Sequence, residues 1–333
     1  MTIKMQPATS QVSETYAHAT AIRNVMLSCG LIALIVLPFF IYPIFVMKVL
    51  CFALFAAAFN LLLGFTGLLS FGHAIFFGGG AYLTAHAAKV WGFSPELSLL
   101  FSFAGAAMLG LGVGAIAIRR QGIYFAMITL ALAQMFYFFC LQVPFTHGED
   151  GIQSVPRGTL FGLFDLGQTA NMYALVLSVF LVGLLIIHRF VNSPFGMVLK
   201  AIRDNENRAV SLGFEVNRYK LAAFVMSAAL SGLAGGLKAL VFQFATLSDV
   251  GWHTSGEAIL ITLLGGIGTM LGPVVGAAIE VGLQDYLATS DFPVTVVTGL
   301  IFMVCVMVFR RGVVGEFITS KFGRKLGLKF ETA

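Results

Sequence analysis

The sequence predicts an all-α integral membrane protein, and composition and run length carry this prediction. Of the 333 residues, 58% are hydrophobic and only 11% are charged, whereas a soluble domain has roughly 25% charged residues. The apolar residues fall in uninterrupted runs of about 20, the length at which an α-helix crosses the hydrocarbon core. Since a bilayer offers backbone groups no water, such runs must be helical. We therefore expect a polytopic bundle of about ten transmembrane helices.

The predicted elements follow a polar N-terminal tail, residues 1–22, which lacks the apolar segment of a signal peptide. We expect this tail to be cytoplasmic, a membrane domain over 23–310, and a basic cytoplasmic tail over 311–333. Within the domain, the apolar runs predict spans at about 24–43, 45–63, 73–89, 97–118, 122–142, 171–189, 219–243, 256–271, 272–289 and 294–309.

The pair of spans over 256–289 is interrupted by Gly265, Gly266, Gly268, Gly272 and Pro273. Such interruptions are typical either of two short spans or of one discontinuous, re-entrant helix that lines a cavity. The sequence leaves both interpretations open.

The basic residues divide unequally between the two sides of the membrane. With the N-terminus inside, the outer side holds few of the 20 lysines and arginines, namely Lys48, Lys89, Arg157 and Lys238. This asymmetry follows the positive-inside rule. It places residues 190–218 and both termini in the cytoplasm and the loop 143–170 outside. The basic residues flank spans, so they indicate no nucleic-acid surface.

The polar segment 192–213 predicts two short helices between apolar halves of the chain. Ser193 is a suitable N-cap, and Pro194 suits the first helical position. The following residues separate into two faces. The apolar stripe is made by Phe195, Val198, Leu199 and Ile202, and the polar face by Lys200, Arg203 and Asp204.

A second helical turn is expected over Ala209–Leu212, capped by Asp204 or Asn205 and ended by Gly213. An amphipathic element of this kind either lies on the bilayer surface or docks into a groove on a soluble partner.

Polar residues within the apolar runs are few, and Asn60, Gln134 and Glu280 are candidates for function because their burial is costly. His73 begins a span, where a lone histidine serves more often as a hydrogen-bonding residue than as a ligand. The 37 glycines predict close helix packing, or helices that slide on one another along a pathway.

Several classes of protein lack support in the sequence. There is no phosphate-binding G-x-x-x-x-G-K-[ST], no G-x-S-x-G nucleophile motif, no Cys-x-x-Cys and no H-E-x-x-H. We expect no catalytic residue, no metal and no cofactor. The cysteines sit in apolar runs and are interpreted as buried small residues, namely Cys29, Cys51, Cys140 and Cys305. Transport is the class that remains.

Several short stretches, in order over about residues 50–310, carry a family resemblance. They are 60–73 (NLLLGFTGLLSFGH), 79–82 (GGAY), 122–134 (GIYFAMITLALAQ), 148–151 (GEDG), 193–196 (SPFG), 201–206 (AIRDNE), 255–257 (SGE) and 265–273 (GGIGTMLGP). In these stretches the chain resembles the permease subunits of branched-chain amino acid ATP-binding-cassette importers, and it is similar to the larger of their two permease types.

The resemblance implies ATP-driven alternating access with a second permease subunit, two cytoplasmic ATPase subunits and a periplasmic binding protein in a bacterial inner membrane. It implies that ATP is hydrolysed by the partners and that residues 190–218 form a coupling loop. The Glu-Ala-Ala that precedes the coupling glycine of many other importers is absent here.

The resemblance and the polar residues within the apolar runs together indicate three groups of site residues. The ATPase-coupling group comprises Ser193, Pro194, Phe195, Gly196, Lys200, Arg203 and Asp204, with Phe195 as its apolar anchor. The translocation-pathway group comprises Asn60, Gly64, Ser70, His73, Tyr82, Gln134 and Glu280. The third group, Glu149 and Asp150 in the acidic turn of the outer loop, either seats the binding protein or lines the entrance, and a solvated glycine turn is the alternative.

Other substrates and another energy source stay open. Importers of urea, short amides or aromatic acids have similar permeases. A secondary transporter would instead couple transport to an ion through a membrane carboxylate such as Glu280.

Overall fold

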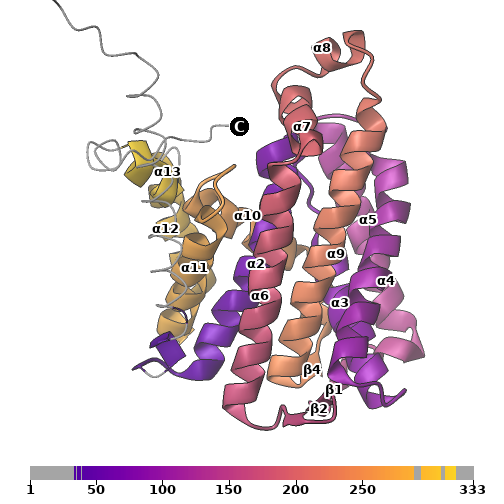
Figure 1. Ribbon diagram of the computed structural model, residues 1–333, viewed down its shortest axis with the longest axis vertical. Coiled ribbons are helices and arrows are strands. Elements are labelled where there is room, and N and C mark those ends of the chain that lie inside the picture. Colours follow the sequence, from indigo (N-terminus) through magenta and orange to yellow (C-terminus); the bar gives the residue numbers. More distant parts are fainter. Residues whose placement is uncertain (1–33, 35, 39, 289–293, 309–311, 320–333) are drawn as a thin grey trace, which may run out of the picture.

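The computed structural model describes residues 34, 36–38, 40–288, 294–308 and 312–319, which form a bundle of helices (Figure 1). The prediction of an all-α membrane protein is confirmed. The predicted tail 1–22, most of the predicted span 24–43, and residues 320–333 of the basic tail lie outside the described residues. The longer helices are α2 (Pro43–Thr66), α3 (Ala74–Lys89), α4 (Pro95–Ala117), α5 (Ile123–Gln142), α6 (Thr169–Val191), α9 (Val216–Phe242), α10 (Trp252–Gly265), α11 (Gly272–Ala288) and α12 (Val294–Val308).

Short elements occupy the two ends of the bundle. At one end lie α7 (Pro194–Asp204) and α8 (Glu206–Ser211) (Figure 1). At the other end, β1 (Ile152–Gln153) pairs antiparallel with β4 (Phe244–Ala245), and β2 (Thr159–Leu160) pairs with β3 (Phe164–Asp165). The remaining short helices are η1 (Pro144–Thr146), η2 (Leu247–Val250) and α13 (Gly312–Thr319).

Within the described residues, five helices are long and apolar enough to cross a membrane, namely α2, α4, α5, α6 and α9. The others that coincide with predicted spans are shorter: α3, α10, α11 and α12 have 16, 14, 17 and 15 residues. The total of ten spans therefore stays a prediction.

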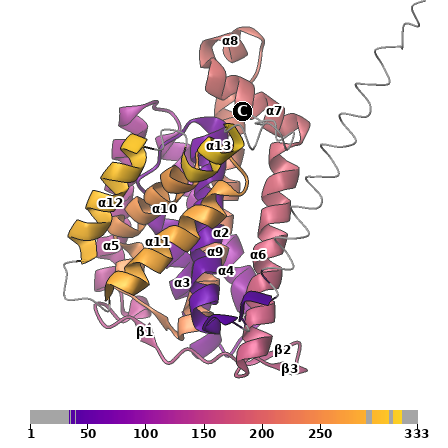
Figure 2. The ribbon, with the colours of Figure 1, turned by 90° about the vertical axis from the view of Figure 1, so that its left-hand side faces the viewer.

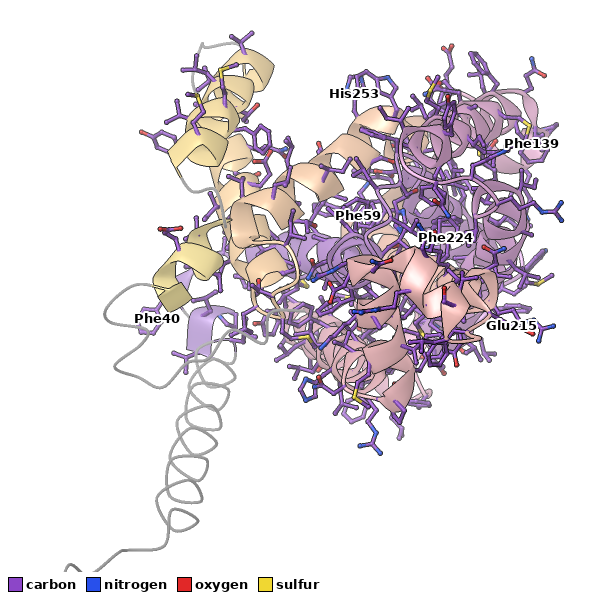
Figure 3. All side chains as sticks on the ribbon, turned by 90° about the horizontal axis from the view of Figure 1, so that it is seen from above. Phe40, Phe59, Phe139, Glu215, Phe224 and His253 are labelled. Carbon is purple, nitrogen blue, oxygen red and sulfur yellow. The ribbon has the colours of Figure 1, made fainter. Side chains whose placement is uncertain are left out.

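The bundle is organised around two central helices, α2 and α9. Of the 18 most apolar consecutive residues in each helix, 78% are buried in α2 and 83% in α9, but only 28–33% in α4, α5 and α6. Seen from above, Phe59 of α2 and Phe224 of α9 lie inside the bundle and Phe139 of α5 lies at its rim (Figure 3). A helix that is apolar on its exposed face suits lipid or another membrane helix, so α4, α5 and α6 form the outer layer of the bundle.

A second group of helices packs against one side of α2. Both α10 and α11 contact α2, and α12 contacts α10 and α11 (Figure 2). A turn at 266–271 separates α10 from α11, so the interrupted run over 256–289 forms two helices in the structure.

Close packing, one of the two expectations for the glycines, is seen where α3 crosses α9. A Cβ added at Gly235 would collide with the carbonyl oxygen of Phe77, and one added at Gly80 would collide with the backbone of Gly232. The two backbones approach each other because neither glycine has a side chain. Residues of α3 and α9 therefore cannot be enlarged at this crossing without moving a helix.

We expect Gly235→Ala to lower the stability of the protein in detergent by about 1–3 kcal/mol, because overpacking a dense contact forces the backbone apart. Thermal unfolding would measure this. Gly112→Ala is the matched control, since Gly112 lies in α4 with no atom within 4 Å of an added Cβ. Equal melting temperatures for the two variants would contradict the importance of the α3–α9 approach.

Candidate functional site

In the polar helix pair at one end of the bundle, α7 begins where the sequence predicts. Ser193 Oγ accepts a hydrogen bond from the Gly196 backbone N–H at 3.3 Å, and Pro194 takes the first helical position of α7. Asn205, one of the two expected caps, accepts from the Arg208 N–H at 3.0 Å, and α8 starts three residues earlier than expected. Both helix starts are thus fixed by short-range capping.

The apolar stripe of α7 faces the protein. Leu199 and Ile202 are buried, and Ile202 forms a small cluster with Ala209 of α8 and Val216 of α9. This part of the stripe is therefore covered by the chain itself and is not available to a bilayer or a partner.

Phe195 also packs within the chain. Its ring stacks on Tyr219 of α9 with a centroid separation of 4.9 Å, and it lies 4.8 Å from the ring of Phe190 in α6. The expectation that Phe195 projects toward a partner therefore differs from its position. It connects α7 to the two helices that flank the polar segment. Other apolar side chains project from the helix pair and the residue after it: Met197 is 61% exposed, Val210 57% and Leu212 69%.

Three charged side chains were expected on the outer face of α7, and two of them turn toward α2. Arg203 Nη1 donates to the Gly64 carbonyl oxygen at 2.6 Å, and Lys200 Nζ lies 5.7 Å from the centroid of the Phe65 ring. The end of α2 has unpaired carbonyl groups and no basic residue of its own, so cations from α7 stabilise it. Asp204 stays exposed.

The α10–α11 turn is held by α2. Asn60 Nδ2 donates to the Thr269 carbonyl oxygen at 2.8 Å, and Asn60 Oδ1 accepts from the Gly268 N–H at 2.9 Å. Gly64 lies directly against the same turn, because a Cβ there would be 2.7 Å from Gly268 N. Asn60 and Gly64, two candidates for the pathway, thus meet at one chain interruption, and Arg203 reaches it from α7.

A second interruption separates α2 from α3. Residues 67–73 are not helical, yet Ser70 and His73 are fully buried. Side chains supply the hydrogen bonds that a helix would provide: Thr129 Oγ1 accepts from Phe71 N–H at 3.2 Å, and Ser255 Oγ accepts from Ala74 N–H at 2.8 Å. Irregular backbone at membrane depth is stable only when it is buried and paired in this way.

His73 is fixed by hydrogen bonding on one side of its ring. Its Nε2 lies 2.8 Å from Ser227 Oγ, and Ser227 donates its single hydroxyl proton to the Ala58 carbonyl oxygen at 2.5 Å. The His73 Nε2 must therefore carry the proton that it shares with Ser227. Rings of Phe59, Phe76 and Phe224 contact the imidazole edge to face.

The other three candidates for the pathway lie apart from these interruptions. Tyr82 is buried in α3, and its hydroxyl has no hydrogen-bond partner among the described residues. Gln134 is half-buried on α5. Glu280 is buried in α11 and accepts from Gln284 Nε2 at 3.2 Å. In the described part of the chain, no group of three or more His, Cys, Asp or Glu side chains is placed to bind a metal ion.

Sequence reasoning missed a buried ion pair at the end opposite α7. Lys238 Nζ of α9 lies 2.7 Å from Asp249 Oδ2 of η2, and Asp249 also accepts from the Thr246 N–H at 3.1 Å. The sequence feature that could have indicated this pair is a lysine within an apolar run with an aspartate eleven residues later. Lys238 was instead interpreted only as a basic residue on the outer side of the membrane.

Arg157 belongs to the same end and pairs with backbone. Its Nη2 donates to the Val241 carbonyl oxygen at 2.7 Å, and its Nε donates to that of Leu240 at 3.3 Å. The loop 143–170 is thereby attached to the C-terminal end of α9, while Glu149 and Asp150 remain exposed.

The structure is thus a helical bundle with two chain interruptions and a polar helix pair at one end, and its long apolar helices suit an integral membrane protein. The family described as "Branched-chain amino acid transport system / permease component" matches residues 41–310, and the chain belongs to this family.

The chain is similar to several curated permeases. It is 28% identical over 276 residues to the high-affinity branched-chain amino acid transport system permease protein LivM of Escherichia coli K12, which covers 75% of this chain and 64% of that protein. It is 27% identical over 198 residues to the ribose import permease protein RbsC of Bacillus subtilis 168, covering 54% of this chain and 58% of that protein. The chain thus spans less than two thirds of the length of either relative. No solved structure matches it.

We expect Asn60→Leu to destabilise the 266–271 turn by about 1–3 kcal/mol, because it leaves a buried N–H and a buried carbonyl oxygen without partners. Asn60→Asp should have a smaller effect, since it keeps an acceptor for Gly268. Hydrogen exchange at the Gly268 amide would measure the change. Gln134→Leu is the control, because Gln134 is a half-buried side-chain amide of α5 that makes no hydrogen bond among the described residues. Equal exchange in all variants would show that Asn60 does not hold the turn.

Proposed function

We propose that the chain is the permease subunit of an ATP-binding-cassette importer for the branched-chain amino acids leucine, isoleucine and valine. The observation that carries this proposal is the family match over residues 41–310. The similarity to a branched-chain amino acid permease over 75% of the chain supports the same substrate class. The chain itself would catalyse no reaction, and separate subunits would hydrolyse ATP.

The proposed assembly contains a second permease subunit, two cytoplasmic ATPase subunits and a periplasmic binding protein in a bacterial inner membrane. The chain would cross the membrane about ten times within residues 23–310, with both termini and residues 190–218 in the cytoplasm and the loop 143–170 outside. The charges support this orientation. The α7–α8 end carries many basic residues, namely Arg119, Arg120, Arg189, Lys200, Arg203, Arg208, Arg218 and Lys220.

The helix pair α7–α8 is the proposed contact with the ATPase. Its inner stripe is covered by the chain, so the exposed Met197, Val210 and Leu212 are available to a soluble partner. We favour docking over adsorption to the bilayer because the chain belongs to a transport-system permease family. Met197 replaces Phe195 as the proposed apolar anchor, because Met197 is exposed whereas Phe195 packs on two rings of the chain itself.

Movement of α7 would pass into the membrane domain through three contacts made by its own side chains. Phe195 joins α7 to α6 and α9, and Arg203 joins it to the end of α2. From there Asn60 reaches the α10–α11 turn. Closure of the ATPase dimer would therefore shift α2, α6 and α9 together and open the pathway alternately to the two sides, with Asn60, Gly64, Ser70 and His73 near it.

The outer loop is the proposed seat of the binding protein. Glu149 and Asp150 are exposed, and the β1–β4 pair and Arg157 hold the loop against α9. A loop held in one position presents its carboxylates to a partner at little entropic cost.

Other substrates define the alternatives. Urea, short amides and aromatic acids fit a similar permease, and the ribose import relative adds a sugar, although it matches only 54% of this chain. Reconstitution in liposomes with the partner subunits tests the proposal: we expect ATP-dependent leucine uptake that requires the binding protein. Uptake driven by a proton gradient without any ATPase would instead favour an ion-coupled transporter that uses a carboxylate such as Glu280.

We expect Met197→Asp to weaken binding of the ATPase subunits by about tenfold or more, since a central apolar anchor is replaced by a charge. Uptake should fall with it. Co-purification of the ATPase and uptake in liposomes measure the two effects. Met197→Leu keeps an apolar side chain of similar volume and should behave like the wild type. Normal ATPase binding by Met197→Asp would contradict docking at this face.

Arg203→Ala should separate ATP hydrolysis from transport. The charged hydrogen bond to Gly64 is worth about 1.5–3 kcal/mol, so its loss should lower leucine uptake about tenfold or more per ATP hydrolysed. The ATPase should still bind, because Met197 and Leu212 are unchanged. Arg189→Ala is the control, because Arg189 is an exposed arginine in the last turn of α6 and lies outside α7 and α8. An unchanged ratio of uptake to hydrolysis would show that the Arg203–Gly64 bond transmits nothing.

A further inference from the structure

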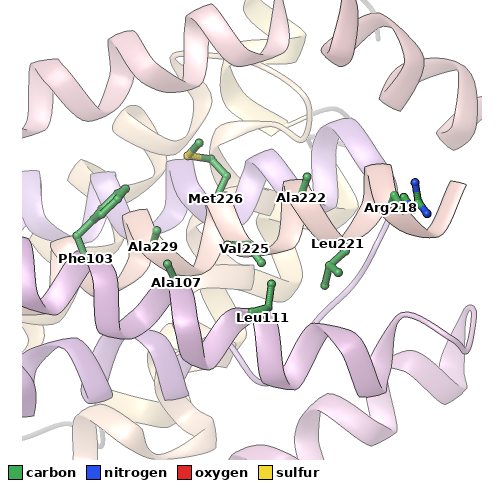
Figure 4. A pocket seen from close by; sticks show the side chains of 9 residues that line it. All are labelled: Phe103, Ala107, Leu111, Arg218, Leu221, Ala222, Val225, Met226 and Ala229. Carbon is green, nitrogen blue, oxygen red and sulfur yellow. The ribbon is translucent and has the colours of Figure 1, made fainter. Parts of the chain in front are cut away.

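An apolar groove of about 410 Å³ runs along the outside of the bundle between α4 and α9 (Figure 4). Phe103, Ala107 and Leu111 line it from α4, and Ala222 and Met226 line it from α9. The small side chains of the alanines leave the space, and the longer apolar side chains form the walls. Its one charged lining residue is Arg218, at the α7–α8 end.

The length of the groove matches one leaflet of a bilayer. From Arg218 to Ala229, the limits of its lining on α9, the helix rises about 16 Å at 1.5 Å per residue. The hydrocarbon core is about 30 Å thick, so the groove covers roughly half of it. Phe103 lies at the end remote from Arg218 (Figure 4). A transmembrane helix of a partner would need a groove of twice this length, whereas a single acyl chain fits.

The open end of the groove is positively charged. The Arg218 side chain is 82% exposed, and only its Nε pairs with a carboxylate, that of Glu215 at 2.6 Å. The turn that follows α4 adds Arg119 and Arg120, both exposed at the same end. Three guanidinium groups therefore accompany one carboxylate at the depth where lipid headgroups lie. Guanidinium groups bind phosphate through paired hydrogen bonds.

We propose that this groove binds an anionic phospholipid, with one acyl chain between α4 and α9 and the phosphate at Arg218. The lipid would come from the leaflet that surrounds the α7–α8 end. This site is separate from the two chain interruptions, and it does not depend on which solute the protein transports.

Native mass spectrometry of the purified full chain tests the site, after incubation with an equimolar mixture of phosphatidylglycerol and phosphatidylcholine. We expect preferential retention of one phosphatidylglycerol. Arg218→Gln should lower that retention about fivefold, since one interfacial arginine contributes about 1 kcal/mol. It should leave retention of phosphatidylcholine unchanged. Ala222→Phe, which fills the groove, should lower retention of both lipids.

Arg208→Gln is the matched control, because Arg208 is an exposed arginine of α8 that does not line the groove. It should retain phosphatidylglycerol like the wild type. Thermal unfolding of each variant checks that the bundle is intact. Equal lipid retention by the wild type, Arg218→Gln and Ala222→Phe would overturn the proposal. So would efficient disulfide cross-linking of Ala222→Cys to a cysteine of another protein subunit in the assembled transporter, since that would identify a protein as the occupant.

Discussion

The structure depends on the need to pair every backbone polar group inside a membrane. Two segments of the described chain, residues 67–73 and 266–271, interrupt the run of helices. Leu69, Ile267 and Leu271 are partly exposed, but side chains from neighbouring helices pair with the backbone of both segments in place of the missing helical bonds. Asn60 pairs with one interruption, and Thr129 and Ser255 pair with the other. These side chains therefore stabilise the irregular backbone, whether or not they also line a pathway.

The close approach of helices follows from the same constraint. Lipid is as apolar as leucine, so helices in a bilayer gain little from apolar burial and associate through close packing and hydrogen bonds. The glycines at the α3–α9 crossing and at the Gly64–Gly268 contact bring backbones together where side chains then donate and accept. The central position of α9 results, and it extends from the polar helix pair at one end to the outer loop at the other.

Much of this organisation could be predicted from the sequence, and the limits have a physical reason. Helix type, the caps of α7 and α8 and the buried stripe on α7 depend on short-range patterns, and these predictions were confirmed in the structure. The partners of Phe195 and Arg203 were not predictable, because periodicity indicates which face of a helix is buried but not what covers it. Lys238 was misjudged for a related reason: a charge count reports the side of the membrane, and only the fold brings Asp249 to it.

Both ends of α9 carry a buried lysine that pairs with a carboxylate outside the helix. Lys238 Nζ lies 2.7 Å from Asp249 Oδ2 of η2 beside the outer loop, and Lys220 Nζ lies 2.7 Å from Glu206 Oε2 of α8 at the other end. Separating two charges that are largely buried is expensive because neither can regain its full hydration. Any displacement of α9 would therefore carry η2 and α8 with it, so that the helix and its two neighbours behave as one rigid body.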